Sequence, residues 1–135
     1  MRNLHSSILL FSFFFILITV ASSCSENEDD VSAPEITITK PAENDTIHVA
    51  KSKVYIEVKS NNSANIDHLE MTVSTQSGTP LYMYEEDHIK NHSFSCSEDF
   101  SCNDIAVVTK VKLIVTCENE FHSWRKKEVN FYLTP

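Results

Sequence analysis

The sequence is poorest in glycine, with Gly78 as its single example. One glycine excludes the glycine-rich loops that bind phosphate groups, and it requires most turns to be made from Asn, Asp and Ser. Basic residues are also scarce, with 11 Lys and Arg against 19 Asp and Glu, for a net charge of −8. That balance argues against a nucleic-acid partner. Neither a His-Glu-x-x-His motif nor a nucleophile elbow occurs, so we expect no enzyme and no cofactor.

The most apolar stretch lies at the start of the chain, from Ile8 to Val20. It falls short of the roughly 20 residues that span a membrane as a helix. Arg2 and His5 precede it and small residues follow it, which is typical of a secretory signal peptide. The sequence therefore predicts a signal peptide over residues 1–23, the alternative being an uncleaved N-terminal anchor.

The small residues end in Ala21-Ser22-Ser23-Cys24, which resembles the lipobox of bacterial lipoproteins. The resemblance implies cleavage before Cys24 and lipids on its sulfur and new amino group. These lipids would anchor the protein permanently in the lipid bilayer. The acidic residues 25–30 are similar to the export signal of Bacteroidota-type lipoproteins, which implies the cell-surface face of the outer membrane. The same residues are also typical of a solvated linker. We therefore expect a disordered tether over residues 24–34.

From residue 35 onward apolar and polar residues alternate, and no window repeats apolar residues at helical spacing. Short runs with this pattern, separated by Asn, Asp, Ser and Pro, lie at 36–39, 46–49, 53–59, 69–73, 81–84, 91–96, 105–117 and 129–133. They predict one all-β domain over residues 35–135, an immunoglobulin-like antiparallel β-sandwich of seven to eight strands. Residues 34–134 resemble immunoglobulin-like domains of bacterial surface lipoproteins, some from families of unknown function.

The last strand of this domain needs a more specific interpretation. The alternation of the last strand places Arg125 and Lys127 inward, so we expect a bulge there that turns Trp124 toward the core. In that case Trp124 and Phe100 would close the two ends of the core.

Three cysteines remain if Cys24 carries lipid. A straight strand from Ile105 to Cys117 would place Cys117 about 40 Å from the loop that holds Cys102. A disulfide requires Cα atoms within about 7 Å, so we predict a Cys96–Cys102 bridge and a buried free thiol at Cys117. A site in which the three cysteines bind a metal is the alternative.

Two further groups of residues suggest binding. His88 and His92 follow Glu85, Glu86 and Asp87, a candidate site for a divalent cation or simply an exposed acidic loop. Exposed aromatic rings stack on sugars or form protein interfaces, and Trp124, Tyr82 and Tyr84 are the candidates for ligand contact. We therefore predict a non-catalytic interaction module with a protein or glycan partner at the cell surface. The alternatives are a carbohydrate-binding accessory domain and a divalent-metal-binding protein.

Overall fold

The computed structural model describes residues 32–50, 54–102 and 105–135, which belong to one compact unit, Val31–Pro135. The predicted signal peptide, Cys24 and most of the tether lie outside the described residues. Within those residues every regular element is a strand. No helix in this part of the chain has the length and apolarity that crossing a membrane requires. The strands are β1 (Glu35–Lys40), β2 (Thr46–His48), β3 (Val54–Thr75), β4 (Pro80–Phe100), β5 (Thr109–Asn119) and β6 (Trp124–Thr134).

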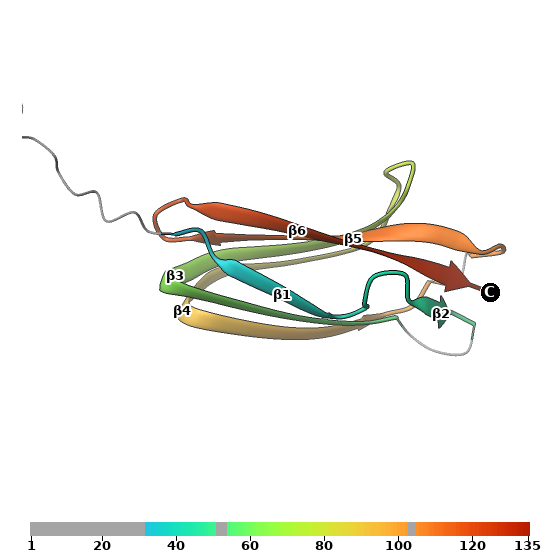
Figure 1. The fold of residues 1–135 in the computed structure, drawn as a ribbon, viewed down its shortest axis with the longest axis horizontal. Coiled ribbons are helices and arrows are strands. Elements are labelled where there is room, and N and C mark those ends of the chain that lie inside the picture. The colour runs from blue at the N-terminus through green and yellow to red at the C-terminus, as the bar shows by residue number, and fades with distance from the viewer. Residues whose placement is uncertain (1–31, 51–53, 103–104) are drawn as a thin grey trace, which may run out of the picture. The chain divides into compact units, whose positions relative to one another are not determined.

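Two long strands, β3 and β4, run through both layers of the sandwich (Figure 1). The first part of β3 pairs with β1, from Glu35 opposite Asn61 to Lys40 opposite Glu57. Its second part pairs with β5, from Ile66 opposite Asn119 to Thr75 opposite Val111. β4 accompanies β3 along both parts. A single sheet thus folds over on itself, and β3 and β4 contribute a segment to each layer.

This arrangement confirms the predicted all-β sandwich and corrects its connections. The two halves of β3 and β4, with β1, β2, β5 and β6, give the predicted number of strand segments. The Asn- and Ser-rich residues 61–65, between the predicted strands 53–59 and 69–73, form no turn but a bend within β3, where the register with β4 shifts between Asn61 and Ile66. Asn and Ser are typical of turns, but here they bend the strand without reversing it.

The sheet order is β1-β3-β5-β6-β2, with β4 on β3. All pairs are antiparallel except β2–β6, which is parallel and joins residues 46–48 to residues 132–134. β1 ends at Lys40, so Pro41 follows the strand as its missing N–H requires.

The core lies between the two layers and comes from alternate positions of the strands. Each fully buried aliphatic or aromatic side chain contributes about 1.5–3 kcal/mol relative to exposure. The largest of them are Phe131, Ile56, Ile66, Leu69, Met71, Leu113 and Leu133. Phe100 is buried as expected.

The bulge predicted near Arg125 and Lys127 is absent, since β5 and β6 pair without a shift from Thr109–Leu133 to Glu118–Trp124. Trp124 is therefore not turned inward, and its side chain is 62% exposed. Lys127 lies opposite the buried Val115, yet its Nζ donates a hydrogen bond to the carbonyl oxygen of Ile36 in β1, at 3.1 Å. Lys127 has the inward parity of its strand but is exposed, because its long side chain reaches the backbone of β1 at the side of the sandwich.

The predicted Cys96–Cys102 disulfide is not formed in this structure, in which Cys96 is a buried free thiol. The prediction assumed that a strand ends at Cys96, whereas β4 continues to Phe100. Four extended residues carry the chain about 14 Å from Cys96, which leaves Cys102 little chain with which to return. Cys117 is a buried free thiol, and its Sγ lies 3.0 Å from Ser60 Oγ in a hydrogen bond across the layers.

Candidate functional site

The three predicted ligand-contact aromatics lie on opposite faces of one layer. Tyr82 pairs with Val73 and Tyr84 pairs with Met71, both buried, so the two tyrosines face the interior. The Tyr82 ring stacks on Phe100 with centroids 4.7 Å apart. Trp124 pairs with Glu118 on the outer face. The rings therefore do not form a common platform.

The interior tyrosines belong to a polar cluster beside Cys96. Tyr82 donates to Glu98 at 3.2 Å, and Tyr84 donates to Glu86 at 2.9 Å. Burial and the neighbouring Glu98 raise the pKa of Tyr82 to about 12. Burial and the hydrogen bond to Glu86 raise the pKa of Tyr84, and burial raises the pKa of the Cys96 thiol. These groups stay protonated at neutral pH, which makes Cys96 a poor nucleophile.

The predicted metal ligands His88 and His92 do not share one group of acidic side chains. His88 has a φ of +57° and lies between Asp87 and Asn91, where the pairing with β3 is irregular. Its Nδ1 lies 3.7 Å from Asp67. Hydrogen bonds from Asn65 lower the pKa of Glu120, and the charge of His92 lowers it further. His92 therefore has a different acidic neighbour from His88. The four-residue spacing of His88 and His92 would align the two side chains on a helix, but this stretch belongs to strand β4.

A different histidine, His68, meets two of the predicted acids on the outer face. Its Nδ1 lies 2.7 Å from Asp87 Oδ1 and 4.0 Å from Glu85 Oε1. The donor atoms of the three side chains all lie within 4.8 Å of one another. The sequence shows His68 on an outward position of its strand, but only the register between β3 and β4 reveals that Asp87 is its direct neighbour.

The surroundings of this cluster are acidic. Glu70 lies opposite Glu85, and Glu118 lies opposite His68 on the β5 side. Glu118 also lies 2.6 Å from His122 Nδ1, and Glu70 accepts a hydrogen bond from Thr72 at 3.1 Å. The outer face thus carries one half-buried histidine among four carboxylates.

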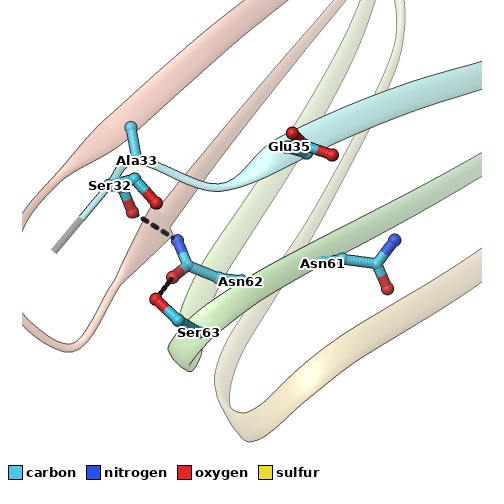
Figure 2. Close-up of a pocket in the computed structure, with 6 residues that line it drawn as sticks. All are labelled: Ser32, Ala33, Glu35, Asn61, Asn62 and Ser63. Carbon is cyan, nitrogen blue, oxygen red and sulfur yellow. Dashed lines mark hydrogen bonds between the residues drawn. The ribbon is translucent and has the colours of Figure 1, made fainter.

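A shallow hollow of about 270 Å³ lies where the chain reaches the domain, beside the start of β1 (Figure 2). Its lining is Ser32, Ala33, Glu35, Asn61, Asn62 and Ser63. Asn62 Nδ2 donates to the Ser32 carbonyl at 2.8 Å, and Ser63 donates to Asn62, as the dashed lines show. This hollow has a structural explanation, because its polar groups attach the incoming chain to the bend of β3.

The β5–β6 turn is organised by a buried asparagine at the same end of the domain. Asn119 Oδ1 accepts from the backbone N–H groups of Phe121 and Ser123, each at 3.0 Å. Its Nδ2 donates to the Ser32 carbonyl at 3.4 Å. The turn and the incoming chain are thus held together by one side chain that is 1% exposed.

Comparison with known proteins gives only distant structural likenesses. No protein-family model and no curated protein matches the sequence. The chain is similar to the crystal structure of CopC from Methylosinus trichosporium OB3b, with a TM-score of 0.47 and 9% identity over 75% of this chain and 95% of that one. It is also similar to a superoxide reductase (neelaredoxin) from Ignicoccus hospitalis, with a TM-score of 0.39 and 9% identity over 76% and 81% of the two chains. Neither likeness assigns an activity to this chain.

Proposed function

We propose that the protein is an exported lipoprotein whose β-sandwich is a non-catalytic interaction module, held at the bacterial outer membrane by lipids on Cys24. The anchor rests on the sequence around Cys24. The interaction role rests on the β5–β6 turn, which we call the aromatic turn and define as residues 119–124.

The observation that carries the interaction role is the exposure of two large aromatic side chains on this turn. Phe121 is 60% exposed and Trp124 is 62% exposed. Neither contributes to the core, and exposed aromatic residues within one short turn mark interfaces more often than they serve stability. Because Asn119 fixes the turn, the rings are presented on a rigid support, which lowers the entropic cost of binding.

The position of the aromatic turn supports a partner close to the membrane. Ser32 bonds to Asn119 at that end of the domain, and Cys24 precedes Ser32 by eight residues. Eight residues span at most about 28 Å when fully extended. An anchored domain therefore keeps its aromatic turn near the bilayer, where a neighbouring membrane protein is within reach.

The glycan alternative has less support. A sugar-binding platform needs several rings on one surface, and Tyr82 and Tyr84 face the interior while Trp124 faces outward. A protein partner requires only the exposed pair at the turn.

Photo-crosslinking of the full-length protein in its native outer membrane tests this function. A benzoylphenylalanine in place of Phe121 is expected to crosslink one discrete protein neighbour. The matched control replaces Val107, which is 69% exposed and lies before β5, away from the turn. We expect the crosslink only from position 121, and a Trp124→Ser substitution in the same chain should reduce its yield at least several-fold. Crosslinks to lipid alone, or equal yields from both positions, would contradict the interaction role.

A further inference from the structure

We propose that His68, Glu85 and Asp87 bind a divalent transition-metal cation on the outer face of the sandwich. We call these three residues the β3–β4 triad. The inference goes beyond the interaction role and does not depend on it.

The strand geometry holds the three ligands on one surface. Glu85 and Asp87 are two residues apart on β4 and therefore point to the same face. His68 pairs directly with Asp87 across the antiparallel ladder, which brings their Cβ atoms to about 5 Å. β3 is paired here on both sides, with β4 and with β5, so its backbone needs no further ordering to bind an ion.

The distances between donor atoms lie close to those of a bound ion. Metal–ligand distances of about 2.1 Å in a tetrahedral site separate neighbouring donor atoms by about 3.4 Å. His68 Nδ1 lies 2.7 Å from Asp87 Oδ1 and 4.0 Å from Glu85 Oε1. Small side-chain rotations would therefore open the first separation and close the second without a change in the strands.

The charges around the triad supply an independent argument. Glu70 and Glu85 are direct cross-strand neighbours, and like charges in that position destabilise a sheet. Glu118 adds a further carboxylate on the other side of His68. A dication at the triad would offset this repulsion. Glu70 and Glu118 already interact with Thr72 and His122, which leaves the triad as the ligand set.

The ligand types favour one class of metal. One imidazole and two carboxylates suit Zn²⁺, Co²⁺, Ni²⁺ and similar ions, whereas Ca²⁺ and Mg²⁺ prefer ligand sets made of oxygen alone. Three protein ligands leave at least one coordination position for water. The site would thus be an open, surface-accessible one.

The single tryptophan offers a direct probe for the test. Trp124 pairs with Glu118, which pairs with His68, so the indole lies about two strand spacings, roughly 10 Å, from the triad. We expect Co²⁺ to quench the fluorescence of the protein, purified from membranes in detergent, in a saturable manner with one ion per chain. Zn²⁺ should reverse the quenching by competition.

Matched variants assign the site. His68→Gln and Asp87→Asn are each expected to weaken Co²⁺ binding at least tenfold, while His88→Gln and His92→Gln leave it unchanged. Far-UV circular dichroism of each variant identifies any that has failed to fold, and the intact ones carry the test. Quenching that does not saturate, or saturable quenching that persists in folded His68→Gln and Asp87→Asn, would overturn the proposal. Neither result affects the crosslinking expected from position 121.

Discussion

At the scale of single residues, the interior holds several ionisable groups in their neutral forms. Burial raises the pKa of the Cys117 thiol, and it also raises the pKa values of Cys96 and Tyr82. In the unfolded chain these groups return to ordinary values near 9 for a thiol and 10 for a tyrosine. The folded state therefore binds more protons than the unfolded state at alkaline pH.

This difference predicts alkaline destabilisation. The free energy of unfolding should be constant with respect to these groups below pH 9 and fall above it, because the unfolded chain loses its protons first. The fall should steepen between pH 10 and pH 12 as Tyr82 contributes. Urea denaturation followed by circular dichroism at a series of pH values measures it. Tyr82→Phe should make the slope shallower in that interval, and a wild-type profile that stays flat to pH 11 would contradict the account.

The ligands of the proposed metal site could be predicted only in part from the sequence. The sequence pointed to Glu85 and Asp87 as candidate acidic ligands, because they lie together in the chain. It paired them with His88 and His92, which are near in sequence, whereas the structure pairs them with His68. The register between β3 and β4 includes irregularities near Ile66 and His68, and these depend on how the whole sheet bends. No local pattern encodes that register.

At the scale of elements, alternation located nearly every strand, and the turn between β3 and β4 was also predictable. Gly78 has a φ of +89°, and a Cβ built there would meet no other atom within 4 Å. A side chain at this position therefore destabilises the fold only through the left-handed backbone conformation and not through a steric clash.

Substitution at Gly78 tests that reasoning. Gly78→Ala should lower the free energy of unfolding by about 1 kcal/mol, because non-glycine residues are disfavoured in the left-handed region. Gly78→Asn should cost less, since asparagine adopts that region more readily. Urea denaturation midpoints of the two variants give the comparison, and an alanine variant as stable as wild type would refute it.

The elements that the sequence did not predict are those that depend on both layers at once. The alternation ends near residue 59 and resumes near residue 69, which is consistent with either a turn or a bend. Only the pairing of one continuous β3 with β1 and then with β5 decides between them. Likewise, the inward parity of Lys127 suggested a bulge, but its side chain stays exposed and donates a hydrogen bond to the carbonyl oxygen of Ile36 in another strand.

At the scale of the whole molecule, the anchor at Cys24 has its own test. Cys24→Ala should abolish fatty-acid labelling and release the exported protein from the membrane, because no lipid can then attach. Ser25→Ala, one residue further on, should leave both labelling and membrane retention as in the wild type. Membrane fractionation with radiolabelled palmitate measures the two outcomes. Retention of labelled Cys24→Ala protein would rule out the anchor.

The link from Ser32 to Asn119 has a mechanical consequence. The Ser32 carbonyl accepts from Asn119 of the aromatic turn and from Asn62 of the β3 bend, at the same end of the domain. Tension between Cys24 and a partner held at Phe121 and Trp124 would load the hydrogen bonds of Ser32 before the long ladders of β3 with β4 and β5. The attachment of Ser32 would therefore be the first part of the domain to open when it is pulled between bilayer and partner.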